Sequence, residues 1–151
     1  IAINDCEVEK TSAMDLARLQ ALHELACYHQ VAEVHGQIAG FLLAMKEGAN
    51  YVNDNYHWFA SRYDRFLYID RIVVDPNYQG QKIGSLLYSD LMDFARQISC
   101  PLLCCEINVI PPNISSINFH RFHGFSEVGE QWLADGRKKV AMQIASVKST
   151  S

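Results

Sequence analysis

The sequence predicts a mixed α/β or α+β fold in a single domain, residues 1–151, and three observations predict it. The length of 151 residues is typical of one domain. Apolar residues make up 49% and charged residues 20% of the chain, which is the composition of a globular protein. Helical and strand-like patterns alternate along the chain without a repeat or a long linker, so helices and strands are expected around one sheet.

The first third of the chain predicts a helix and a β-hairpin. Ser12 and Asp15 resemble a capping box, and leucines then recur along one side of a short helix. Two strand-like runs follow, and Gly36 between them supplies the positive φ of a tight turn. The predicted elements are a helix over 12–27 and strands over 28–34 and 37–45.

Residues 46–65 are rich in aromatic side chains, and two interpretations stay open. A long loop in a compact domain is usually functional, so the segment could form a wall of an acceptor site, with Tyr51, Trp58 and Phe59 as candidates for substrate contact. Alternatively, it folds as a helix and buries its rings against the sheet or against a second copy of the chain. The spacing of Trp58, Phe59 and Tyr63 suits a helical turn, so packing or a homodimer contact is favoured.

The rest of the chain predicts four strands and two helices. A turn at Asp75-Pro76-Asn77 ends the first of these strands. Apolar positions then follow the i, i+3, i+4 spacing of an amphipathic helix, and Pro111-Pro112 separates the next strand from a second helix. The predicted strands cover 66–74, 102–109, 125–132 and 137–146, with a turn at Asp135-Gly136, and the predicted helices cover 84–98 and 114–122.

Charge and hydropathy exclude two classes of partner. Lys and Arg number 13 against 17 Asp and Glu, which gives −4 with neutral histidines. A weakly acidic chain has no overall field that attracts phosphate backbones, so we expect no nucleic-acid partner. No apolar run approaches the ~20 residues that span a bilayer and no signal-peptide pattern is found, so we expect a cytoplasmic protein without a membrane partner. Because the chain starts at Ile1, we expect a native segment to precede it.

The cysteines indicate neither disulfides nor a metal site. Their number is odd, and none of them forms a C-x-x-C pair. Adjacent cysteines inside a strand point to opposite faces and do not easily share a metal ion. We therefore expect no metal ligand and five small buried thiols in a reducing compartment, Cys6, Cys27, Cys100, Cys104 and Cys105.

The junction between strand 66–74 and the following helix is suited to an anion. Gly80 and Gly84 let the backbone bend and approach a ligand closely. The unpaired N–H groups of the first helical turn carry the positive end of the helix dipole, and Lys82 adds a cation beside them. The spacing is neither that of a Walker A loop nor that of a dinucleotide fingerprint. The alternative is an ordinary strand-to-helix turn.

Two motifs resemble those of the GCN5-related N-acetyltransferases, the GNAT superfamily. The run Gln79-Gly80-Gln81-Lys82-Ile83-Gly84 is similar to the pyrophosphate loop Q/R-x-x-G-x-G/A, with Lys82 where glycine is usual. Residues 113–125 are similar to N-x-x-A-x-x-F-Y-x-x-x-G-F, since Asn113, Phe119, Gly124 and Phe125 match while Ser116 replaces Ala and His120 replaces Tyr. The resemblance spans residues 12–146, and its specific part is 66–125.

The resemblance implies a mixed, mostly antiparallel sheet flanked by helices and splayed between the family's fourth and fifth strands, here 66–74 and 102–109. The family's first strand has no counterpart in this chain. Acetyl-CoA is the implied cofactor, with its pyrophosphate on the N–H groups of residues 80–85 and its pantetheine arm along the strand that ends at Val74. The implied cofactor-binding residues are Ile72, Val73, Val74, Gln79, Gly80, Gln81, Lys82, Ile83, Gly84, Ser85, Asn113 and Phe119.

The resemblance also implies an acid for the leaving thiolate. His120 stands where the family usually has a tyrosine near the CoA sulfur, and an imidazole titrates close to physiological pH. The alternative is that His120 is a helix residue that only covers the cofactor. His123, three residues further along the same helix, is a weaker candidate.

Strand alternation suggests two candidate bases. Asp70 is expected on one face of its strand with Tyr68, Ile72 and Val74, while Glu106 shares a face with other polar residues of the neighbouring strand. A carboxylate in an apolar strand is costly to bury unless it is paired. Asp70 and Glu106 are therefore either catalytic or members of structural pairs, and Arg71 is expected to be a neighbour of Asp70 in sequence only. A water chain is a further candidate base.

The sequence thus predicts an acetyl-CoA-dependent N-acetyltransferase that acts on the primary amine of a small-molecule or amino-acid-like acceptor by direct attack in a ternary complex. Three alternatives stay open. The acceptor could instead be a protein N-terminus or a lysine, or the chain could be a non-catalytic acyl-CoA-binding module, or a structural domain without a ligand.

Overall fold

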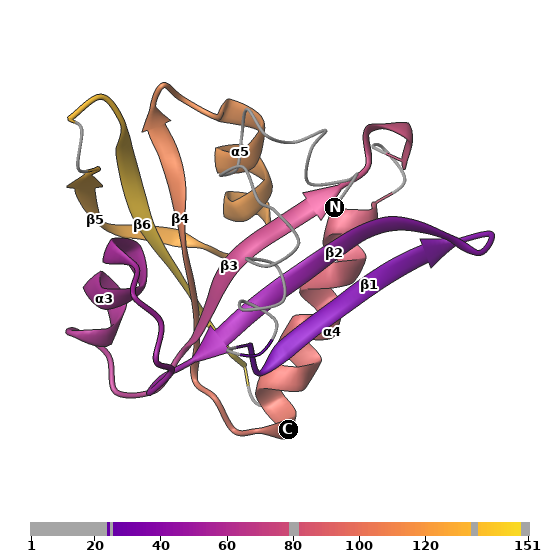
Figure 1. Ribbon diagram of the computed structural model, residues 1–151, viewed down its shortest axis with the longest axis horizontal. Helices are drawn as coiled ribbons and strands as arrows, with labels where there is room; N and C mark the ends of the chain where they lie inside the picture. The colour runs from indigo at the N-terminus through magenta and orange to yellow at the C-terminus, as the bar shows by residue number, and fades with distance from the viewer. Residues whose placement is uncertain (1–23, 25, 79–81, 134–135, 149–151) are drawn as a thin grey trace.

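The computed structural model describes residues 24, 26–78, 82–133 and 136–148, and within them the chain forms one six-stranded sheet (Figure 1). The strand order is β1-β2-β3-β4-β6-β5. Neighbouring strands are antiparallel, except that β3 and β4 are parallel. The mixed, mostly antiparallel sheet is therefore confirmed. The strands are β1 (Tyr28–Val34), β2 (Gln37–Lys46), β3 (Leu67–Val74), β4 (Leu102–Ile110), β5 (Ser126–Trp132) and β6 (Lys139–Ser146).

Helices of the described residues connect these strands. The two helices predicted after residue 83 are present, and a short helix forms inside the aromatic segment. Most of the predicted helix over 12–27, together with Cys6 and Asp135, falls on 1–23, 25 and 134–135, outside the described residues. The helices are α3 (Asp54–Ala60), the 3-10 turn η1 (Pro76–Tyr78), α4 (Ile83–Gln97) and α5 (Ile114–Phe122).

The β1–β2 hairpin forms where the sequence predicts it. Its turn residues His35 and Gly36 have φ of 51° and 78°, so the chain reverses through two left-handed positions. Glycine adopts such angles without steric cost, which is why this dipeptide fixes the turn.

The sheet carries a separate core on each face. Consecutive residues Leu42 and Leu43 of β2 belong to different cores, as strand alternation requires. One core lies under α4, which contributes Leu87, Leu91 and Ala95. The other contains Tyr51 together with Tyr56 and Phe59 of α3. The aromatic segment therefore packs against the sheet, as its helical spacing indicates.

The parallel strands β3 and β4 part after a short contact. Their ladder consists of two residue pairs, Leu67–Leu103 and Tyr68–Cys104, and no rung joins the described residues beyond them. Figure 1 shows the two strands diverging from this contact toward their carboxyl ends. The predicted splay between these strands is confirmed.

A β-bulge in β3 changes which side chains share a face. Leu43 of β2 pairs with Arg71 and Ala44 pairs with Ile69, so Asp70 has no partner residue in the ladder. Ile72 packs in the same core as Ile69, on the α4 face. The expected alternation of Asp70 with Ile72 and Val74 is therefore wrong, because the extra residue shifts the phase of the strand.

No helix among the described residues is long and apolar enough to cross a membrane. The same part of the chain contains no group of three His, Cys, Asp or Glu side chains that could hold a metal ion. Its cysteines are free thiols, and Cys27 is the least buried of them; they are Cys27, Cys100, Cys104 and Cys105.

Candidate active site

A cavity of about 720 Å³ lies where β3 and β4 separate. Its walls come from both strands, the start of α4, the inner side of α5 and the loop that leads into α3. Most residues predicted for the site line this cavity. They are Tyr51, Asp70, Ile72, Val74, Lys82, Ile83, Gly84, Ser85, Glu106, Asn113, Phe119 and His120.

The start of α4 faces this cavity and has no side-chain cap. Lys82 occupies the N-cap position with a φ of 61° and makes no capping hydrogen bond. The first helical bond from this turn runs from the Leu86 N–H to the Lys82 carbonyl at 3.0 Å. The N–H groups of Ile83, Gly84 and Ser85 therefore have no partner within the helix, which makes an anion site. Gln79, Gly80 and Gln81 lie outside the described residues.

Gly84 is required by the close approach of α5. A Cβ atom at this position would lie 3.0 Å from Cζ of Phe119. The Phe119 ring also packs against Tyr88 of α4, with 5.4 Å between ring centroids. The second glycine of the loop thus lets α4 and α5 come together beside the cavity.

Asn113 begins α5 at the cavity edge. Its side chain accepts a hydrogen bond from the Ser116 N–H at 3.3 Å, as an N-cap residue does. Its own N–H donates to the Asn108 carbonyl of β4 at 3.1 Å. These contacts hold the first turn of α5 against the end of β4.

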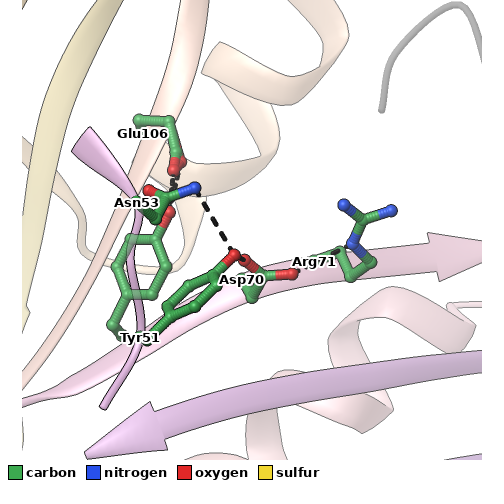
Figure 2. A network of polar contacts seen from close by, with 6 residues as sticks. Tyr51, Asn53, Asp70, Arg71 and Glu106 are labelled. Carbon is green, nitrogen blue, oxygen red and sulfur yellow. Dashed lines mark hydrogen bonds and ion pairs between the residues drawn. The ribbon is translucent and has the colours of Figure 1, made fainter. Parts of the chain in front are cut away.

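Asp70 lies in a buried network with Tyr51 and Arg71 (Figure 2). The Tyr51 hydroxyl donates to Oδ1 at 2.5 Å, and Arg71 Nε donates to Oδ2 at 3.0 Å. The Asp70 and Arg71 side chains are 4% and 6% exposed. The expectation that these two are neighbours in sequence only is wrong, because the bulge removes the strict alternation that would separate them.

Glu106 lies on β4 two residues beyond the last rung of the β3–β4 ladder. The Tyr68 hydroxyl donates to its carboxylate, with 3.0 Å to Oε2. Burial raises the pKa of Glu106 to about 7, although the hydrogen bond from Tyr68 works in the opposite direction. Glu106 is thus a carboxyl group that exchanges protons near physiological pH at the point where the cavity begins.

His120 is buried on the inner side of α5. Its Nδ1 lies 2.8 Å from the Ser116 carbonyl oxygen, and its Nε2 lies 2.5 Å from the Tyr88 hydroxyl. Burial lowers the pKa of this imidazole, so the ring is neutral at pH 7. His123 is half-buried at the C-cap position that follows this helix, where its Nε2 lies 3.0 Å from the Ser85 hydroxyl.

A splayed sheet with an uncapped helix at its opening is the geometry that the GNAT motifs imply. The model of the acetyltransferase (GNAT) family matches residues 2–125. The chain belongs to this family. GNAT enzymes are N-acetyltransferases, and acetyl-CoA is their acetyl donor. No curated protein matches the chain by sequence.

Solved GNAT structures share this fold over most of the chain. Ard1 from Thermoplasma volcanium has a TM-score of 0.77 at 16% identity, covering 98% of this chain and 88% of its own. The ribosomal-protein-alanine N-acetyltransferase from Brucella melitensis has a TM-score of 0.71 at 23% identity, covering 96% and 90%. An acetyltransferase from Bacillus anthracis, solved with acetyl coenzyme A, has a TM-score of 0.64 at 20% identity, covering 84% and 68%.

The GNAT chain has the groups that acetyl-CoA requires. A pyrophosphate is an anion, and the start of α4 offers N–H groups without partners in the helix. The arm of the donor carries amides, and the separated edges of β3 and β4 offer main-chain groups that no rung between these two strands uses. The donor and the described residues are therefore chemically complementary.

Four of the described residues that the sequence predicts for the site do not line the cavity, and one of them is His123. Phe59 is fully buried under the sheet, and Trp58 lies against Gly129 of β5. Val73 points to the other face, where it packs with Phe41. Sequence reasoning missed Tyr68 and Tyr88, which contact Glu106 and His120. Nothing in the local sequence around either tyrosine marks its hydroxyl group as part of a site.

Proposed function

We propose that this GNAT protein transfers an acetyl group from acetyl-CoA to the primary amine of a small-molecule or amino-acid-like acceptor, by direct attack in a ternary complex. One observation supports this proposal above the others. A single cavity joins the uncapped start of α4 to the carboxyl group of Glu106, so one opening contains a place for a diphosphate and a base.

The donor would be held along the gap. The N–H groups of Ile83, Gly84 and Ser85 would receive the pyrophosphate, with Lys82 beside it and with Gln79, Gly80 and Gln81 completing the loop. The edge of β3 would receive the arm through main-chain groups of Ile72, Val73 and Val74. Asn113 and Phe119 would close the α5 side. When bound there, acetyl-CoA supplies an activated acetyl group as a thioester.

Glu106 would act as the general base. An acceptor amine is mostly an ammonium ion at neutral pH and must lose a proton before it can attack. A carboxylate with a pKa of about 7 accepts that proton more readily than an ordinary glutamate does. Asp70 already interacts with Arg71 and Tyr51, so it would attract and orient the ammonium group instead.

His120 would take part in moving the proton that the departing sulfur requires. It lines the cavity from α5, and its position corresponds to the tyrosine of the family motif. Tyr51 would form part of the acceptor wall, as the aromatic residue of 46–65 that both lines the cavity and contacts Asp70.

A protein N-terminus is the second candidate acceptor. The Brucella melitensis ribosomal-protein-alanine N-acetyltransferase aligns over 96% of this chain, a more complete match than the 84% of the Bacillus anthracis enzyme. Both acceptors present a primary amine to the same carboxyl groups, so the choice depends on what surrounds the amine.

The test is release of free thiol from acetyl-CoA with two sets of acceptors. One set contains small primary amines and amino acids, and the other contains short peptides that begin with alanine. We expect turnover with the first set and about 100-fold less with Glu106→Gln. The exposed residue Glu127 of β5 gives the matched control Glu127→Gln, which should keep full activity. A rise in melting temperature with CoA but no thiol release would indicate a binding module and would refute the proposal.

A further inference from the structure

Tyr88 of α4 and His120 of α5 form a buried pair in the wall of the cavity. The Tyr88 hydroxyl oxygen and His120 Nε2 are 2.5 Å apart. The two residues are 3% and 5% exposed, and both line the cavity. Tyr88 belongs to neither of the GNAT motifs in this sequence.

The hydrogen bonds of His120 fix its tautomer. The Ser116 carbonyl, 2.8 Å from Nδ1, can only accept, so Nδ1 carries the ring proton. In the neutral ring Nε2 is then an acceptor, and the Tyr88 hydroxyl must be its donor. Neutral His120 therefore has no N–H left for a group in the cavity.

The oxygen of Tyr88 is the part of this pair that can accept a proton from the cavity. Burial raises the pKa of Tyr88 well above its usual value, so a free phenolate is unfavourable. The oxygen can nevertheless take up a proton while it passes its own proton to Nε2. The two proton transfers can also occur in the reverse order. Nε2 then returns a proton to the Tyr88 oxygen as Tyr88 gives its own proton to a group in the cavity.

We propose that Tyr88 and His120 form a proton shuttle that carries one proton from the attacking nitrogen of the acceptor to the departing sulfur. The proposal rests on the acetyl transfer proposed above. During transfer the N–C bond forms and the C–S bond breaks at the same carbon, so one hydroxyl can serve both atoms.

An acceptor ammonium group loses two protons in all: Glu106 takes the first before the attack, and the shuttle moves the second in two steps. First, the nitrogen gives a proton to the Tyr88 oxygen as the Tyr88 proton moves to Nε2. Then Tyr88 gives a proton to the sulfur as the Nε2 proton returns to Tyr88. Both residues end as they began and no further reactant is required. Tyr88 is the catalytic residue, and His120 acts through it.

Few titratable groups in the described part of the chain surround the pair. Cys105 and Glu106 of β4 approach Tyr88, and His123 of α5 approaches His120. The remaining rings against the pair belong to Phe119 and Phe125. A loss of activity below pH 6.5 would therefore reflect His120, His123 or Glu106, and variants must separate them.

The first variant is Tyr88→Phe, which removes the hydroxyl and keeps the ring. We expect kcat to fall about 100-fold, while KM for acetyl-CoA and the thermal shift with CoA stay within about twofold of the unchanged protein. Tyr28→Phe is the matched control. Tyr28 is 4% exposed, and its hydroxyl also contacts α4, 2.5 Å from Asp90, but it does not line the cavity. This control should keep its kcat.

The second variant is His120→Gln, which can still accept from Tyr88 but cannot take up a proton. We expect the same loss as in Tyr88→Phe, and a double variant that is no slower than either single variant. Nitrogen-15 NMR of the histidines gives a readout that does not depend on turnover. His120 should carry its proton on Nδ1, and its Nε2 signal should move in Tyr88→Phe but not in Tyr28→Phe.

The outcomes separate the two proposals. If the unchanged protein releases no thiol with any amine, the proposed function fails and the shuttle fails with it. If the protein is active and Tyr88→Phe or His120→Gln retains full kcat, the shuttle is refuted and the transferase stands. A proton on Nε2 of His120 in the unchanged protein would also refute the shuttle.

Discussion

Arg71 forms a buried ion pair with Asp70, the residue directly before it in β3, with 3.0 Å between Nε and Oδ2. Adjacent residues of a regular strand point to opposite faces and cannot pair in this way. The bulge at Asp70 allows the contact. It thereby places beside the cavity a carboxylate whose negative charge is balanced by the Arg71 guanidinium.

Replacing the arginine should therefore destabilise the fold. Arg71→Leu leaves the Asp70 carboxylate buried without its cation, and we expect a loss of about 3–5 kcal/mol in the free energy of unfolding by urea. Adding Asp70→Asn should restore part of that loss. Arg96→Leu is the control, because its partner Asp93 is 63% exposed, and we expect less than about 1 kcal/mol. An Arg71→Leu protein as stable as the parent would show that the pair has no structural role.

Activity should increase as the pH rises through about 7. Glu106 has a pKa of about 7, and only its deprotonated form can accept the ammonium proton. The log of kcat should therefore rise between pH 6 and 7 and level off above pH 8. We would measure thiol release at saturating acceptor. A profile that falls over this range would exclude Glu106 as the base.

The raised pKa of Glu106 predicts that stability, unlike activity, decreases as the pH rises. The folded protein holds the Glu106 proton more tightly than the unfolded chain, whose value is near 4.5, so this group lowers stability as the pH rises from about 4.5 to 7. At about 1.4 kcal/mol per pKa unit, the effect on the free energy of unfolding is at most about 3.5 kcal/mol. Glu106→Gln should thus gain in melting temperature relative to the parent across this window. If the difference in melting temperature between Glu106→Gln and the parent stays constant across this window, the pKa of Glu106 is not raised by burial.

Gly84→Glu should abolish CoA binding. The new Cβ would lie 3.0 Å from Cζ of Phe119, and the added carboxylate would stand at the helix end that attracts anions. We would measure the shift in melting temperature with CoA. Gln97→Glu adds the same charge at the other end of α4 and should keep the shift. Retained affinity in Gly84→Glu would place the diphosphate elsewhere.

Gly129→Ala should destabilise the contact between α3 and β5. A Cβ at this position would lie 2.5 Å from Cζ2 of Trp58, closer than a Cβ atom approaches a neighbouring side chain in real structures. We expect a loss of about 1–3 kcal/mol, measured by thermal unfolding. Replacing Trp58 by Leu in the same protein should relieve the clash. If Gly129→Ala is harmless alone, Trp58 does not pack there.

Local rules were sufficient for most elements of this fold. Gly36 fixes the hairpin, the spacing of Leu87 and Leu91 fixes α4, and Asn113 caps α5. Each of these signals acts within a few residues, so the sequence alone displays it. The two motifs likewise indicated the splay, because the loop and the later helix flank it in the family.

Features that depend on pairing between distant segments could not be predicted. The bulge at Asp70 arises from the register of β3 against β2, and it brought Arg71 to the carboxylate. The contact between Tyr88 and His120 joins residues 32 positions apart in two different helices, so the pattern of neither helix alone indicates it. Within the aromatic segment 46–65, only the structure shows that Tyr51 lines the cavity and that Phe59 does not.

The short ladder between β3 and β4 has a thermodynamic consequence. A sheet normally protects its central amides from hydrogen exchange better than those at its rim. Here the inner edges of two central strands, beyond Tyr68 and Cys104, do not form rungs with each other. A bound extended molecule that bridges them would act as a missing strand, so ligand occupancy and cooperative unfolding are coupled through the middle of the sheet.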